Sequence, residues 1–91
     1  MIKIMTREEL SEMKHEILDS LLRIANDQNP GEPFFIRCLV PEYIWRDWKK
    51  KNIGVVLWLG KRFYEHPERK AIFKCIYPAE KYGAALYVNA W

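Results

Sequence analysis

An amphipathic helix at the start of the chain constrains the fold most, because both of its ends are marked. Residues Thr6–Glu9 read as a capping box, in which the Thr6 hydroxyl accepts from the Glu9 amide and the Glu9 carboxylate accepts in return. Residues Asn29–Gly31 are a strong stop and turn signal. Between these signals, apolar residues recur at spacings of three and four and fall on one stripe: Leu10, Met13, Ile17, Leu21 and Ile24. We therefore expect a helix over residues 6–27.

The rest of the chain predicts a strand, two short helices and a hairpin. An aromatic and β-branched run favours a strand, Pro41 suits the first turn of a helix, and Pro67 ends another helix because the residue before proline disfavours α conformation. Asn52 is either a left-handed stop or the cap of the next helix. The expected elements are a strand over 33–40, helices over 41–51 and 53–66, and a β-hairpin of strands 71–77 and 84–91.

This order of elements, in 91 residues, is typical of one α+β domain of the winged helix-turn-helix type. The short first strand would pair with the C-terminal hairpin, and three helices would pack on that small sheet. The alternative is a generic α+β domain with the same elements packed differently. No apolar run approaches the roughly 18 residues that a membrane helix needs, and the N-terminus has no apolar segment of signal-peptide length, so we expect a cytoplasmic protein.

Catalytic and metal-binding motifs are absent from the sequence. The glycines are scattered, which is unlike a phosphate-binding loop, and no nucleophile-and-base signature is present. The cysteines and histidines, at positions 38, 75, 15 and 66, show no metal-ligand spacing. We expect Cys38 and Cys75 to be buried, inert thiols on neighbouring strands. We therefore expect no enzyme, no cofactor, no metal and no small-molecule substrate.

The middle of the chain resembles a known family. Gly31-Glu32-Pro33-Phe34, Leu39-Val40-Pro41, Trp45 and Leu59-Gly60-Lys61-Arg62-Phe63 resemble the pattern of small bacterial and phage proteins catalogued as domain of unknown function 1413. The resemblance covers roughly residues 8 to 77, and its shared positions are mostly hydrophobic. The basic run Lys49–Lys51 is not required by the family pattern. The family name supplies no activity, although some members are labelled DNA-binding by analogy.

Charge is distributed unevenly along the chain. Residues 1–40 carry five basic and seven acidic side chains and residues 41–91 carry ten and five, so the net charge of +3 divides into −2 and +5. A DNA-binding winged helix places its third helix in the major groove, and Lys and Arg supply most of the sequence-independent affinity. We therefore predict that double-stranded DNA binds Arg46, Lys49, Lys50, Lys51, Lys61, Arg62, Lys81 and Tyr82. The basic half also holds Arg69, Lys70 and Lys74. The alternative is that these cations only solvate a surface.

Trp58 supports a second hypothesis. At 100° per residue the core face of helix 53–66 holds Val56, Leu59, Gly60 and Phe63, whereas Trp58 falls on the opposite face with Arg62 and Glu65. An exposed Trp flanked by Arg is typical of a protein interface. A protein partner or a second copy of the chain would then bind Trp58, Arg62 and Glu65, as in a phage or mobile-element inhibitor of a host defence nuclease. The alternative is that the helical register differs and Trp58 is a core residue.

Overall fold

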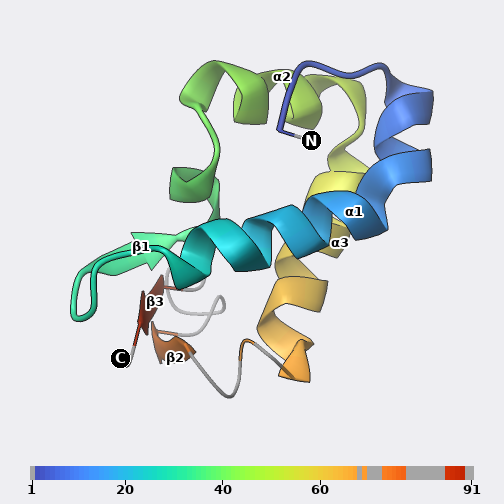
Figure 1. Ribbon diagram of the computed structural model, residues 1–91. Coiled ribbons are helices and arrows are strands. Elements are labelled where there is room, and N and C mark those ends of the chain that lie inside the picture. Colours follow the sequence, from blue (N-terminus) through green and yellow to red (C-terminus); the bar gives the residue numbers. More distant parts are fainter. Residues whose placement is uncertain (1, 68, 70–72, 78–85, 90–91) are drawn as a thin grey trace.

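Three α-helices and a small antiparallel sheet make up the described part of the chain (Figure 1). A computed structural model describes residues 2–67, 69, 73–77 and 86–89. The elements follow in the order α1 (Arg7–Asn26), β1 (Pro33–Phe35), the 3-10 helix η1 (Ile36–Leu39), α2 (Glu42–Lys51), α3 (Ile53–Glu65), β2 (Phe73–Tyr77) and β3 (Leu86–Asn89). The expected α+β class is confirmed. Within this described part, no helix has the length and apolar character needed to cross a membrane.

α1 has the expected capping box at its start. The Thr6 hydroxyl accepts from the Glu9 amide at 3.1 Å, and the Glu9 carboxylate accepts from the Thr6 amide at 3.0 Å. The hydrogen bond from the Thr6 backbone amide holds the pKa of Glu9 below its ordinary value. The helix begins and ends within one residue of the predicted range. Its buried face is wider than the predicted stripe and consists of Leu10, Ile17, Leu18, Leu21, Leu22 and Ala25, while Met13 and Ile24 are partly buried.

The predicted strand over residues 33–40 is wrong beyond Phe35, where the chain enters η1. The reason is visible in the burial of Leu39 and Val40, which are adjacent in sequence and are both buried. Successive residues of a strand point to opposite faces, so a continued strand would turn one of these two side chains away from the core. The 3-10 turn lets both enter it.

Asn52 is the cap of α3, so the left-handed alternative is wrong. Its φ is −154°, and its side-chain oxygen accepts from the Val55 amide at 3.3 Å. α2 and α3 are therefore joined by this single residue, whereas a helix-turn-helix commonly has a turn of about three or four residues. Pro41 also differs slightly from expectation, because it caps α2 rather than forming its first turn.

The sheet has the strand order β1-β3-β2, and both pairings are antiparallel. β3 is thus central, and β1 pairs with the C-terminal hairpin as expected. The expected hairpin is confirmed over Phe73–Tyr77 and Leu86–Asn89. Its remaining predicted residues, 71–72, 84–85 and 90–91, lie outside the described ones.

The cysteines differ from expectation. Cys38 lies in η1 and is exposed, and Cys75 lies on β2 and is half-buried. No disulfide bond joins them. Because β3 separates β1 from β2, neither the predicted strand neighbours nor two fully buried thiols are found.

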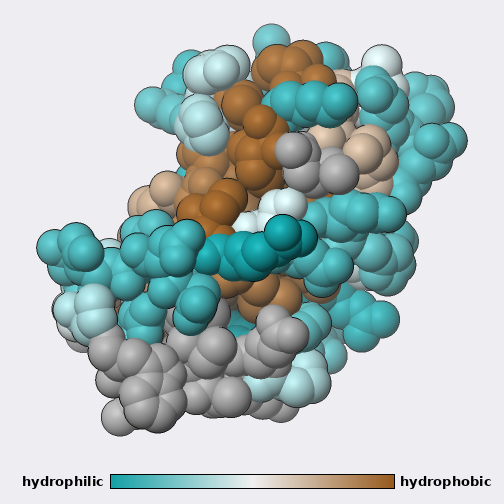
Figure 2. Space-filling view, in the orientation of Figure 1, coloured by the Kyte–Doolittle hydropathy of each residue, from teal (hydrophilic) through white to brown (hydrophobic). Residues whose placement is uncertain are grey.

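Tyr87 connects the sheet to the helices. Its ring lies edge-on to Phe63 of α3, with 4.9 Å between centroids, and 6.0 Å from the ring of Phe34 on β1. All three residues belong to the apolar core, together with the inner faces of α1, α2 and α3. On the face shown in Figure 2, apolar side chains reach the surface between α2 and α1, and hydrophilic side chains cover the outer side of α1. The core therefore holds α3 against both α1 and the sheet.

Candidate nucleic-acid interface

The predicted cations on α2 and α3 are exposed, but they differ in whether they form ion pairs with carboxylates of the same chain. Arg46 forms an ion pair with Glu42 one turn earlier, at 2.5 Å. Within the described residues, no carboxylate lies within ion-pair distance of Lys49, Lys50 or Lys61. These three side chains keep their full charge available for a partner.

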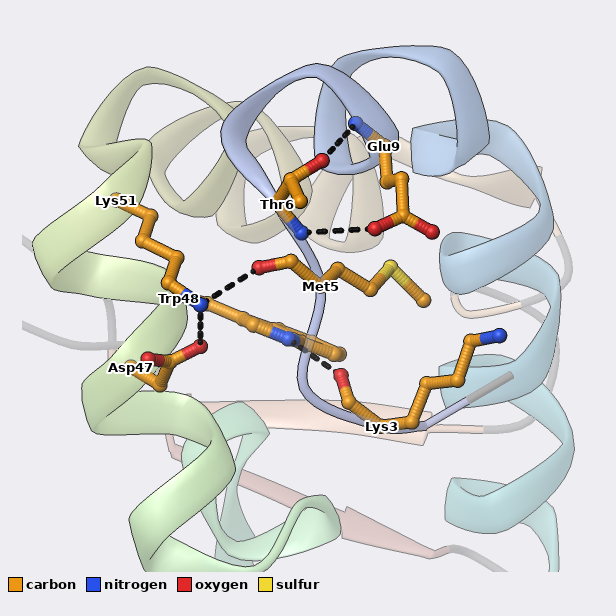
Figure 3. Close-up of polar contacts among 7 residues, drawn as sticks. All are labelled: Lys3, Met5, Thr6, Glu9, Asp47, Trp48 and Lys51. Carbon is orange, nitrogen blue, oxygen red and sulfur yellow. Dashed lines mark hydrogen bonds and ion pairs between the residues drawn. The ribbon is translucent and has the colours of Figure 1, made fainter.

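Lys51 holds the N-terminal segment of the chain (Figure 3). Its ammonium group donates to the Met5 carbonyl at 3.0 Å and lies 3.1 Å from the Asp47 carboxylate. The neighbouring Trp48 indole donates to the Lys3 carbonyl at 2.8 Å. Met5 and Trp48 are both fully buried, so Lys51 takes part in closing the core at this end of α2.

The predicted basic surface is smaller than the sequence indicates, because Arg69 is buried. Its guanidinium donates to the Tyr64 carbonyl through Nε, at 2.8 Å, and through Nη2. It also lies over the Tyr64 ring and near the ring of Tyr87. Lys70, Lys81 and Tyr82 lie outside the described residues, as does the side chain of Lys74.

Trp58 is half-buried and packs against α1. Its ring lies edge-on to His15, with 5.0 Å between centroids, and the Lys14 ammonium lies 4.7 Å from its centroid. The Arg62 guanidinium lies 5.8 Å from the same ring. Trp58 is therefore neither an inner core residue nor a protruding anchor, and much of its surface is already covered by its own chain.

A shallow hollow of about 360 Å³ lies beside Trp58, between α1 and the end of α3. It brings Arg62 and Glu65 together with Trp58, as the protein-interface hypothesis expects, and adds α1 residues that sequence reasoning did not include. The hollow is lined by His15, Leu18, Asp19, Trp58, Arg62, Glu65, His66 and Pro67. Within the described residues, no group of three or more His, Cys, Asp or Glu side chains could hold a metal ion.

Sequence reasoning missed an exposed apolar stripe on the other side of α3. Ile53 is 50% exposed, Leu57 67% and Tyr64 42%. At 100° per residue, Leu57 and Tyr64 lie only about 40° and 20° from Ile53 around the helix, on the flank next to the core face, since Val56 lies about 60° from Ile53. The same count that placed Trp58 could have found this stripe. We call Ile53, Leu57 and Tyr64 the α3 stripe.

Comparisons with protein-family models, with curated proteins and with solved structures found no match. The resemblance to the domain of unknown function 1413 therefore stays a prediction.

Proposed function

We propose that the protein is a non-enzymatic winged-helix protein that binds double-stranded DNA, with Lys49, Lys50, Lys61 and Arg62 contacting phosphates. The observation that carries this proposal is that these four exposed cations lie on two adjoining helices, and none of the four has a carboxylate partner among the described residues. Positive charge that is not neutralised within the protein is what a polyanion binds.

The arrangement of elements supports the winged-helix part of the proposal. Three helices, a short strand after the first helix and an antiparallel C-terminal hairpin follow one another in the order expected for that fold. The central position of β3 lets β1 and the hairpin form one sheet. Other α+β domains share both features, so the proposal of DNA binding depends on the exposed cations.

Local charge around α3 is also favourable for a phosphate backbone. α3 has no acidic residue in its first turn. Lys49 and Lys50 lie in the last turn of α2, within four residues of the start of α3. Lys61 and Arg62 follow on α3 itself, and Glu65 is the one carboxylate that this helix carries. The start and middle of α3 can therefore approach DNA without repulsion from their own helix.

The test is a binding titration of the chain with a labelled duplex, by fluorescence anisotropy at low salt. We expect Lys49→Gln/Lys50→Gln to weaken binding about tenfold, because two exposed ion pairs together contribute about 1.4 kcal/mol. Lys3→Gln/Arg23→Gln is the matched control, since it removes the same charge from exposed positions outside α2 and α3. Equal losses in the two variants would mean that net charge alone attracts DNA, and no binding by the unmodified chain would refute the proposal.

A protein-binding module is the second candidate function, and the α3 stripe favours it. Large apolar side chains exposed together on one helix face are a common mark of protein interfaces. The Trp58-centred surface that the sequence suggested is less open, because His15 and Lys14 contact that ring. In the α3 stripe the Arg69 guanidinium lies over the Tyr64 ring, so Ile53 and Leu57 provide its most exposed apolar surface. Inhibition of a host defence nuclease would be one use of such a module.

A further inference from the structure

We propose that the α3 stripe docks an acidic amphipathic helix of a partner protein. This inference rests on the second candidate function and does not require the chain to bind DNA. Its starting point is the placement of Ile53, Leu57 and Tyr64, which form one lengthwise row of exposed side chains beside the buried face of α3. A helix laid along such a row can bury apolar residues at the same spacings.

The charges beside the stripe select the kind of partner. Lys61 follows Leu57 by one turn, and Lys49 and Lys50 precede Ile53 in the last turn of α2. Within the described residues, none of these three lysines has an ion-pair partner. An apolar row that has Lys61 beside it and two lysines in the helical turn that precedes it complements a helix that has an apolar row flanked by carboxylates.

The same charges argue against other occupants. A second copy of the chain would bring its own Lys49, Lys50 and Lys61 to the interface if the two α3 stripes met, and like charges would then face one another. DNA would engage the lysines, but it offers few apolar groups for Ile53 and Leu57 apart from thymine methyls. An acidic helix uses both the apolar row and the cations.

The probe is a synthetic helical peptide of about 18 residues, or about five turns, with leucines on one face and glutamates beside them. A scrambled peptide of the same composition keeps the charge and removes the apolar face. We expect the amphipathic peptide to bind at least tenfold more tightly than the scrambled one. Leu57→Ser should weaken its binding about tenfold, because the exposed part of a leucine side chain is no longer buried on docking.

Ile4→Ser is the matched control, since Ile4 is a comparably exposed apolar residue in the N-terminal segment and should leave peptide affinity unchanged. Both variants change exposed side chains, and an unchanged melting temperature will confirm that they fold. Equal affinity for the two peptides, equal effects of the two variants, or no peptide binding would each overturn the inference. The labelled duplex is titrated in parallel: its failure to bind refutes the DNA proposal alone, and peptide binding then still supports the acidic-helix partner.

Discussion

Asn52 shows how much of this fold depends on a single side chain. Its backbone amide donates to the Trp48 carbonyl at the end of α2, and its side-chain oxygen caps α3. The side-chain amide of Asn52 also donates to the Arg7 carbonyl at 3.2 Å and to the Ser11 hydroxyl at 3.0 Å, both on α1. One residue therefore fixes the relative positions of three helices.

We predict that Asn52→Ala lowers the free energy of unfolding by about 2 kcal/mol, because it removes a helix cap and two inter-helix hydrogen bonds. Asn52→Asp separates these effects, since the carboxylate still caps α3 but cannot donate to α1. Its loss should be smaller than that of Asn52→Ala. Urea denaturation of the two variants measures both values, and equal losses would mean that the cap of α3 contributes nothing beyond the bonds to α1.

Tyr87 provides a prediction about alkaline pH. Burial raises the pKa of its hydroxyl well above the ordinary value, and the nearby Arg69 opposes this only in part. Because the raised pKa belongs to the folded state, the hydroxyl ionises first in the unfolded chain, at a pKa of about 10. The stability that the neutral hydroxyl supports is present below that pH and is lost as the pH rises above it.

When the pH is raised from 8 to above about 10, the free energy of unfolding should therefore fall less for Tyr87→Phe than for the unmodified chain. The measurement is the free energy of unfolding of both proteins at the two pH values. Tyr64→Phe is the control, because Tyr64 is exposed. A parallel decline of the Tyr87→Phe variant and the unmodified chain would contradict the assigned cause.

The stability of helix α1 depends on its first turn. Thr6→Ala removes the hydroxyl that accepts from the Glu9 amide, and we expect a loss of about 1 kcal/mol in unfolding free energy. Ser20→Ala, in the middle of the same helix, should be neutral or slightly stabilising because alanine has the higher helix propensity. Thermal unfolding followed by circular dichroism tests both, and equal effects would show that the cap contributes no stability of its own.

The elements that the sequence predicted well are those with local signals. The capping box at Thr6 and the proline after His66 determine helix ends through contacts within a few residues, and both ends lie where expected. The strand over 33–40 was predicted too long because its end is set by the core, which takes both Leu39 and Val40. That requirement depends on distant elements, so the sequence of residues 33–40 does not indicate it.

The sequence predicts which charged residues the candidate site contains, but not which of them already bind other groups within the protein. Sequence position alone does not show that Arg69 donates to the Tyr64 carbonyl or that Lys51 holds the Met5 carbonyl. Helical periodicity placed Trp58 on the face of α3 opposite the core, whereas the residue is half-buried and packs against the edge of the core. Periodicity could not show that α1 would cover the ring, because that contact depends on how two helices pack.

The positive charge that the whole molecule can offer a partner is less than its sequence suggests. The net charge of +3 is small, and part of the basic half is used internally by Arg69 and Lys51. What remains on α2 and α3 is Lys49, Lys50, Lys61 and Arg62. DNA binding through four phosphate contacts releases counterions, and the logarithm of affinity should then fall with the logarithm of salt concentration with a slope of about −3 to −4.

The salt dependence of duplex affinity counts phosphate contacts and so shows whether the cations of α2 and α3 bind DNA. Titrations at several salt concentrations should give the steep slope for the unmodified chain. Lys49→Gln/Lys50→Gln should make the slope shallower by about 2, whereas Lys3→Gln/Arg23→Gln should leave it unchanged. A slope that is the same in all three proteins would contradict the assignment of α2 and α3 as the DNA-binding surface.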